Sequence, residues 1–272
     1  MLRQVCCFLA AGCLFAAEPV RVALVAGKPS HPPGHHEFNA GVILLEKCLR
    51  QNNLEPVVVR GGWPEDESVL DNARTLVFYL NGGAQHPMIL PDRLERIGRL
   101  MRRGVGLVCL HYAVEVPAQK GGEQFLDWLG GFYDRPYSQN PINDAEVTQA
   151  SPAHPISRGW KSFRGRDEWY YRIRFREGDP RLTPILTTML PPQQPARETI
   201  AWAAERLDGG RAFGFTGGHF HDNWGQADFR RMVVNAILWT AKVEVPSGGA
   251  QCDISPQWLT QNLDDKPPTR RK

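Results

Sequence analysis

Short apolar runs alternate with amphipathic stretches through the first half of the chain. The runs are compact and rich in Val and Leu, which is typical of buried strands, and the stretches between them repeat apolar residues at helical spacing. Strands are predicted at residues 20–26, 56–60, 75–80 and 105–110, and helices at 38–51, 65–73, 91–103 and 123–129. This alternation predicts an α/β fold: a doubly wound, mostly parallel sheet of the flavodoxin-like type, covered by helices on both faces.

The alternation stops between residues 132 and 200. Residues 167–175 alternate apolar and polar positions as a strand does. Residues 199–204 and 211–215 read as two strands joined by a Gly-Gly turn, which predicts a hairpin. We therefore expect an antiparallel extension built on the main sheet.

The last periodic segment is a helix predicted at residues 229–241. Beyond it the chain is rich in Gly, Pro and charge, so that residues 247–272 are predicted to be a loose C-terminal tail, and residues 18–246 the single folded domain.

The N-terminus has the features of an export signal. Arg3 precedes an apolar run over residues 5–17 that is too short to span a bilayer and ends in small residues. We predict a signal peptide at residues 1–17 and an exported protein, periplasmic or at the cell surface, with no transmembrane segment. Two alternatives remain: a lipid anchor at Cys13, which follows Ala-Ala-Gly, or a buried first strand with an apolar leader.

Charge and cysteine content narrow the function classes. The net charge is +3 and the Arg-rich segments are interleaved with acids, whereas nucleic-acid binding usually needs a one-sided basic face, so no nucleic-acid partner is expected. Outside the signal region only Cys48, Cys109 and Cys252 remain, without motif spacing, which excludes a disulfide framework and a C-x-x-C site.

Histidines gather where the predicted strands end. Ligands of open parallel sheets bind at the carboxyl ends of the strands, and imidazole suits both proton transfer and metal binding. His111 ends a strand directly before a turn, which is the geometry of a nucleophile elbow with imidazole in place of Ser or Cys. Seven of the eight histidines fall at this edge: His31, His35, His36, His86, His111, His219 and His221.

Carboxylates and aromatic residues accompany these histidines. Glu37 follows His36, Glu115 lies four residues after His111, and Asp167 and Glu168 precede Tyr170. The acids can instead pair with nearby arginines, and the aromatic residues can instead belong to the core. Sugar rings pack on flat apolar faces that have polar groups beside them. Such faces could be provided by Tyr112, Tyr170 and Trp224.

Five segments together resemble the trehalose-utilisation (ThuA-like) family. They are SHPPGHHEFNAG at 30–41, GLVCLHYAVEVP at 106–117, HPISRG at 154–159, DEWYY at 167–171 and GFTGGHFHDNW at 214–224. The resemblance implies a fold similar to class I glutamine amidotransferases, in which the amidotransferase Cys nucleophile is absent. It also implies a role in sugar catabolism, including disaccharides and their keto derivatives.

The leading hypothesis is a carbohydrate-active enzyme acting on a sugar or keto-sugar. His111 and His219 would transfer protons with help from Glu168 as acid or base. The predicted substrate-binding residues are His36, Glu37, Tyr112, Glu115, Asp167, Tyr170 and Trp224. A variant adds a divalent metal such as zinc, held by His219, His221 and either His36 or His35. The alternative is a non-catalytic sugar-binding or complex-forming module.

Overall fold

The computed structural model describes residues 19–267 of the chain. The predicted signal peptide, including Cys13, lies outside this range. Among residues 19–267, no helix combines the length and the apolar character that crossing a bilayer requires.

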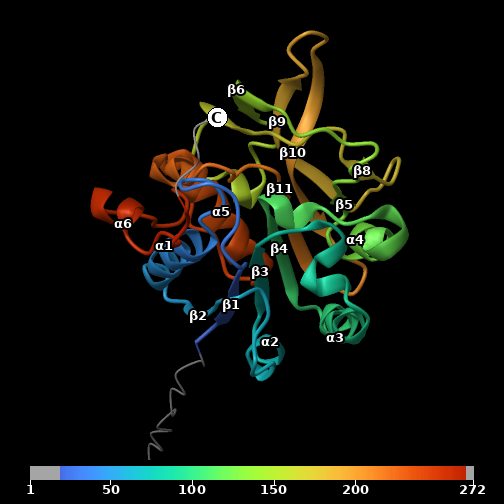
Figure 1. Cartoon of the computed structure of the whole chain (residues 1–272), viewed down its shortest axis with the longest axis vertical. Helices are drawn as coiled ribbons and strands as arrows, with labels where there is room; N and C mark the ends of the chain where they lie inside the picture. The colour runs from blue at the N-terminus through green and yellow to red at the C-terminus, as the bar shows by residue number, and fades with distance from the viewer. Residues whose placement is uncertain (1–18, 268–272) are drawn as a thin grey trace, which may run out of the picture.

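The core of the fold is a nine-stranded sheet in the order β2-β1-β3-β4-β11-β10-β9-β6-β7 (Figure 1). Its first five strands pair in parallel. These are β1 (Arg21–Ala26), β2 (Glu55–Val59), β3 (Thr75–Tyr79), β4 (Gly106–Leu110) and β11 (Arg211–Phe215). The doubly wound, mostly parallel sheet predicted from the sequence is confirmed.

The other four strands form the antiparallel extension that was expected. They are β10 (Ala196–Glu205), β9 (Leu182–Leu190), β6 (Ile142–Gln149) and β7 (Phe163–Glu168), and a separate small sheet pairs β5 (Gly131–Phe132) with β8 (Arg174–Phe175). The predicted hairpin is present as β10 and β11, with Asp208 Oδ1 accepting a hydrogen bond from Gly210 N across the turn. The predicted strand at 167–175 is wrong, because β7 ends at Glu168 and a positive φ at Arg172 breaks the extended backbone.

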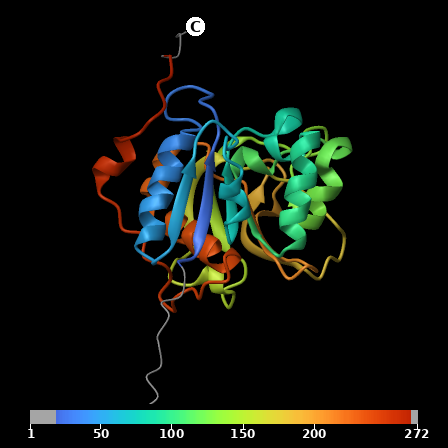
Figure 2. The ribbon, with the colours of Figure 1, turned by 90° about the horizontal axis from the view of Figure 1, so that it is seen from below.

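Helices cover both faces of the sheet, as Figure 2 shows. On one face lie α1 (Phe38–Arg50) and α5 (Ala227–Thr240), and on the other α3 (Pro91–Arg102) and α4 (Glu123–Trp128), while α2 (Ser68–Asp71) is shorter than predicted. Alternate residues of β1 therefore enter different cores: Val22 and Leu24 pack with α1 and α5, and Ala23 and Val25 with α3 and α4. Short helical turns in the connections are η1 (Gly83–Gln85), η2 (Pro87–Ile89), η3 (His111–Val114), η4 (Ala118–Gly122), η5 (Pro155–Ser157) and η6 (His221–Gly225).

The segment after α5 packs on the domain, so the prediction of a loose tail is wrong for residues 247–267. Asn52, just after α1, holds Gln251 by two hydrogen bonds, from Asn52 Nδ2 to Gln251 O and from Gln251 N to Asn52 Oδ1. The chain then forms α6 (Pro256–Thr260) and continues to the loop before α1, where the side chain of Lys266 is almost fully buried against Glu37. Sequence composition did not indicate this, because the apolar residues that pack on the core, Ala250, Cys252, Ile254 and Leu259, are scattered rather than spaced as one helical stripe.

Candidate active site and metal-binding cluster

Three imidazoles and one carboxylate converge at the carboxyl ends of the parallel strands. His36 lies in the loop before α1, His111 opens η3 directly after β4, and His219 lies in the loop after β11. Glu168, the last residue of β7, reaches the same point from the extension. We call these four residues, His36, His111, Glu168 and His219, the histidine–glutamate cluster; each offers one ligand atom, and these atoms lie within 4.8 Å of one another.

The three ring nitrogens form a tight triangle. His36 Nε2 is 2.9 Å from both His111 Nε2 and His219 Nδ1, and these last two atoms are 3.3 Å apart. Glu168 Oε2 lies 3.1 Å from His219 Nδ1 and 3.5 Å from His111 Nε2.

These separations fit a single cation at the centre. Metal–ligand bonds of about 2.0–2.1 Å in a tetrahedron place the ligand atoms about 3.3 Å apart. A hydrogen bond between two imidazoles uses the lone pair of one nitrogen only. A central cation can instead accept the lone pairs of all the ligand atoms that face it. Three imidazoles and a carboxylate form a donor set that zinc accepts.

Hydrogen bonds behind the cluster fix which nitrogen faces inward. His111 Nδ1 lies 2.8 Å from the carbonyl oxygen of Thr216, an acceptor only, so that Nδ1 carries the proton and Nε2 presents its lone pair to the cluster. His219 Nε2 lies 2.7 Å from His35 Nδ1, which leaves His219 Nδ1 free to face the cluster.

Asp167 holds the loop that carries His219. Its buried carboxylate accepts main-chain N–H bonds from Gly218 at 2.6 Å and from His219 at 2.9 Å. Burial raises the pKa of Asp167 to about 6, against the lowering effect of these hydrogen bonds. Asp167 therefore positions His219, rather than contacting a substrate as predicted.

The backbone is strained at the site. His36 has a φ of 48° and His111 a φ of 53°, and His31 beside them has a φ of 64°. Non-glycine residues rarely adopt this left-handed region, and such strain concentrates at functional sites. The elbow predicted at His111, a strand followed at once by a helical turn, is present.

Burial keeps two imidazoles of the cluster, those of His36 and His111, neutral. It lowers the pKa of His111 to about 3 and moves the pKa of His36 well below its ordinary value, with the neighbouring histidines adding to the second shift. For Glu168, burial raises the pKa, but the hydrogen bonds with His219 and Asn140 act in the opposite direction, and the pKa is lowered overall. The neutral imidazoles of His36 and His111 and the ionised carboxylate of Glu168 are in the protonation state that metal binding needs.

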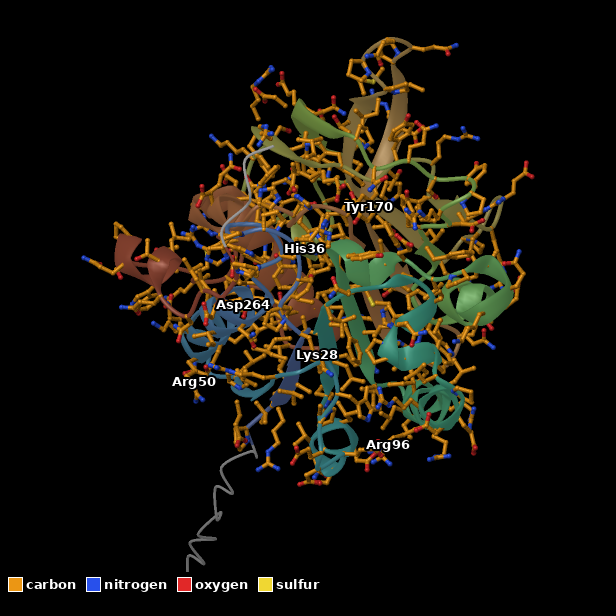
Figure 3. The ribbon with its side chains drawn as sticks, in the orientation of Figure 1. Lys28, His36, Arg50, Arg96, Tyr170 and Asp264 are labelled. Atoms are coloured by element: carbon orange, nitrogen blue, oxygen red, sulfur yellow. The ribbon has the colours of Figure 1, made fainter. Side chains whose placement is uncertain are left out.

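A cavity of about 210 Å³, which we call the inner pocket, opens onto the cluster. Its lining residues are His31, His36, Tyr112, Glu115, Tyr133, Arg135, Asn140, Glu168 and Tyr170. Two of them, His36 and Tyr170, are labelled in Figure 3 near the ends of β3 and β4. The Tyr170 hydroxyl lies 3.4 Å from His111 Nε2. Burial raises the pKa of Glu115 to about 7, so this carboxyl group can give or take a proton near neutral pH.

Three other predicted site residues lie away from the inner pocket. Trp224 is buried against Tyr79 and Phe229, so it belongs to the core. Glu37 is buried in an ion pair with Lys266. His221 opens η6 and is not one of the converging ligands, so the predicted metal set of His36, His219 and His221 is wrong in its third member, and His111 and Glu168 complete the cluster instead.

The pocket residues missed from the sequence are Tyr133, Arg135 and Asn140. Asn140 donates from Nδ2 to Glu168 Oε1 at 2.9 Å, and Tyr133 donates from its hydroxyl to Asn140 Oδ1. All three lie in a connection without periodicity, where neither helix nor strand spacing marks an inward-facing residue. His86, placed at the same edge by the sequence, instead caps η2 by accepting a hydrogen bond from Met88 N.

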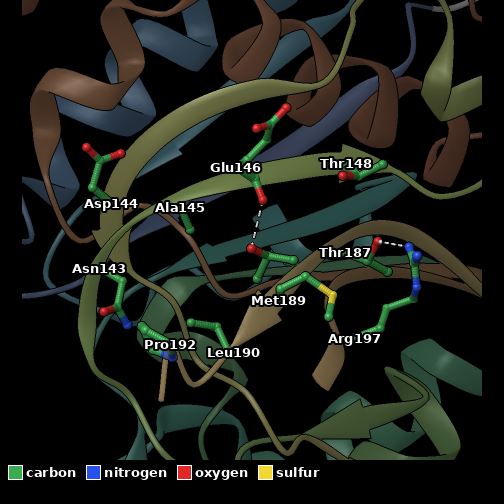
Figure 4. A pocket seen from close by; sticks show the side chains of 11 residues that line it. Asn143, Asp144, Ala145, Glu146, Thr148, Thr187, Met189, Leu190, Pro192 and Arg197 are labelled. Carbon is green, nitrogen blue, oxygen red and sulfur yellow. Dashed lines mark hydrogen bonds between the residues drawn. The ribbon is translucent and has the colours of Figure 1, made fainter. Parts of the chain in front are cut away.

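A further hollow of about 380 Å³ lies on the antiparallel extension (Figure 4). Asp144 and Glu146 of β6 and Arg197 of β10 line it, and Arg197 bonds Thr187 of the neighbouring strand. It contains no histidine and shares no residue with the inner pocket, so its larger volume does not make it the better candidate for chemistry.

Solved structures of other proteins show which fold this chain shares. A putative ThuA-like protein from Bacteroides uniformis superposes with a TM-score of 0.65 at 15% identity, covering 83% of this chain and 93% of that one. One from Parabacteroides merdae gives 0.59 at 15% identity, over 86% and 97%. The carbohydrate deacetylase Agd3 gives 0.52 at 13% identity, over 82% of this chain but 32% of that one. At these identities the likeness shows the fold alone.

No curated protein matches the chain in sequence. The family model described as trehalose utilisation (ThuA) matches residues 21–240, which include the whole histidine–glutamate cluster. The resemblance expected from the five sequence segments is confirmed, and the chain belongs to the trehalose-utilisation (ThuA) family.

Proposed function

We propose that this protein is a metal-dependent enzyme acting on a sugar or an oxidised sugar. The observation that carries the proposal is the convergence of His36, His111, Glu168 and His219 on one point at the wall of the inner pocket. Family membership and the fold shared with a carbohydrate deacetylase support a carbohydrate as the substrate class.

The cluster would hold a divalent cation, with zinc favoured by its imidazole-rich donor set. Such a cation polarises a bound oxygen or lowers the pKa of bound water. In this arrangement the imidazoles act as ligands, which changes the role first expected of His111 and His219 from proton transfer to metal binding. Proton transfer then falls to groups facing the pocket, Glu115 and the Tyr170 hydroxyl.

A thiol mechanism has no support at this site. Cys109 is fully buried in β4, and burial raises the pKa of its thiol, so a reactive thiolate does not form there.

Export remains part of the proposal and rests on residues 1–17. Mass spectrometry of the protein recovered after expression with its native N-terminus tests it. Loss of the first residues near Ala17 supports a signal peptide, a lipid on Cys13 supports an anchor, and an intact N-terminus contradicts both.

The metal proposal is tested by elemental analysis and zinc titration of protein freed from metal with a chelator. We expect one zinc per chain, and loss of binding in His111→Ala with the fold retained. His154→Ala is the matched control, since His154 lies outside the cluster and bonds Ile156 N. Absence of binding in the wild type, or binding unchanged in His111→Ala, contradicts the proposal.

Turnover is tested with the zinc-loaded protein on a panel of sugars and keto-sugars, with product analysis by mass spectrometry. Conversion that is abolished by the chelator supports the enzyme. Tight binding of a sugar without conversion supports the non-catalytic module instead.

A further inference from the structure

Another hollow opens at the carboxyl ends of β1, β2 and β3. It measures about 430 Å³, and we call it the basic hollow. Its lining includes Lys28 after β1, Gly61 and Gly62 after β2, Asn81 after β3, and the side chains of Trp63 and Arg93. It shares no lining residue with the inner pocket, so a ligand held here would be separate from the histidine–glutamate cluster.

The position of the basic hollow in the sheet is one where open α/β folds bind ligands. The chain passes outward from β1 to β2 and then returns past β1 to β3, so the direction of winding reverses between β1 and β3. Ligands bind outside the carboxyl ends of the strands at such a reversal. The volume of the hollow also lies within the range of about 300–1,000 Å³ that is common for small-molecule sites.

The basic hollow carries positive charge that the fold does not neutralise. Lys28, which is labelled in Figure 3, and Arg93 both line it, and none of its lining residues is acidic. Within residues 19–267, neither of these two side chains makes a hydrogen bond or an ion pair with the chain. Asp92, which precedes Arg93, is exposed and does not line the hollow.

The acidic residues of the neighbouring loop are already engaged by a different arginine. Glu67 accepts a hydrogen bond from Trp63 Nε1 at 2.6 Å and pairs with Arg96 at 2.8 Å. Arg96 also binds Asp71. These carboxylates are therefore compensated by Arg96, and the charge of Arg93 is left for a ligand.

The hollow is built from side chains and main chain that are held in place. Arg93 Cζ lies 4.7 Å from the centre of the Trp63 ring, and the bond to Glu67 fixes that ring. A guanidinium packed on an aromatic face keeps its N–H donors for other partners. Gly61 and Gly62 have φ values of 81° and 92°, and a Cβ atom on either would meet nothing within 4 Å, so the main chain here is open to a ligand.

We infer that the basic hollow binds the phosphate group of a small organic phosphate. A phosphate monoester carries nearly two negative charges at neutral pH, which matches the two unpaired cations, whereas a carboxylate would leave one of them without a partner. Arginine binds phosphate through two parallel hydrogen bonds, and lysine binds it as a point charge. The volume left beside a phosphate group has room for the organic part of the ligand.

The test uses protein freed from metal with a chelator, so that no phosphate is held by a cation at the cluster. Calorimetry measures the binding of inorganic phosphate, phenyl phosphate and benzoate to the wild type and to Lys28→Met and Arg93→Met. Lys28 is exposed, so its replacement leaves the core intact. Arg102→Met is the matched control, since Arg102 is an exposed arginine of the same helix as Arg93 and does not line the hollow.

We expect phenyl phosphate to bind the wild type and Arg102→Met with equal affinity, and to bind Lys28→Met and Arg93→Met about tenfold or more weakly. Benzoate should bind the wild type about tenfold more weakly than phenyl phosphate, because it carries a single charge. The affinity for phenyl phosphate should fall as salt is added, since both cations are partly exposed to solvent.

Three outcomes contradict the inference. They are the absence of saturable phenyl phosphate binding, equal affinities in Lys28→Met and Arg102→Met, and benzoate binding as tight as that of phenyl phosphate. Inorganic phosphate that binds as tightly as phenyl phosphate would contradict the organic part of the ligand. Because the cluster holds no metal in this experiment, each of these results leaves the proposed function untouched.

Discussion

Lys266 and Glu37 form a buried ion pair that holds the C-terminal segment to the loop carrying His35 and His36. Lys266 Nζ lies 3.1 Å from Glu37 Oε1, and the two side chains are 2% and 1% exposed. Lys266 Nζ also donates to the carbonyl oxygens of His35 and His36, and Glu37 Oε2 accepts a hydrogen bond from Asp264 N. A residue outside the family match at 21–240 therefore holds the main chain of His36 in its left-handed conformation.

We predict that Lys266→Met destabilises the fold by about 3–5 kcal/mol, because it leaves the Glu37 carboxylate buried without its cationic partner. Zinc affinity should fall by about 10–100-fold, as for loss of other groups that orient a metal ligand. Urea unfolding of the metal-free protein measures the first effect and zinc titration the second. Lys242→Met, at an exposed lysine, is the control; the same zinc affinity in Lys266→Met and wild type would contradict the positioning role.

Asp167→Asn tests the support of His219. An amide has one acceptor oxygen, so one of the two N–H groups of Gly218 and His219 loses its partner, at a cost of about 1–3 kcal/mol. We expect zinc affinity to fall by about tenfold or more because the His219 loop shifts. Asp222→Asn, at an exposed aspartate three residues after His219, should leave both stability and zinc affinity unchanged; equal effects of the two variants would show that Asp167 has no special role.

The sequence was sufficient to predict the parallel sheet and the edge of the sheet at which the site lies. Apolar runs and helical spacing located the parallel strands, and the rule that ligands bind at the carboxyl ends of these strands brought His36, His111 and His219 together. The spacing of apolar residues can be read from neighbouring positions in the sequence. The location of the histidines at strand ends then needs only the general rule for parallel sheets.

The residues that sequence reasoning misplaced depend on tertiary contacts. In an extended strand His219 and His221 would face the same side. Here His36 N bonds His219 O, His221 N bonds Gly34 O, and η6 begins at His221, so only His219 enters the cluster. Lys266 lies about 230 residues from its partners, and no local pattern predicts that pairing.

His219 and His221 should therefore behave differently. We predict that His219→Ala lowers zinc affinity by more than about 100-fold, since losing a ligand costs more than losing an orienting group. His221→Asn should leave zinc affinity within about threefold of the wild type, whatever it does to stability, because its ring is not among the ligands. Zinc titration of both metal-free variants measures this difference, and equal losses would support the metal set predicted from the sequence, in which His219 and His221 are both ligands.

Glu115 should make stability depend on pH. Burial, assisted by the charges of Glu168 and Asp134 and opposed by Arg135, raises its pKa in the folded state to about 7. Between the ordinary glutamate pKa and about 7, the folded state binds more protons than the unfolded state, so this group makes stability fall as pH rises.

Glu115→Gln removes that contribution. Relative to the wild type it should therefore be more stable at pH 8 than at pH 4, by on the order of 1 kcal/mol after allowance for solvent screening, or about 2–4 °C in Tm. Thermal unfolding of both proteins across this range measures the difference, with Glu95→Gln on the exposed face of α3 as the control. A difference between wild type and Glu115→Gln that does not change with pH would show that Glu115 titrates as an ordinary surface carboxyl.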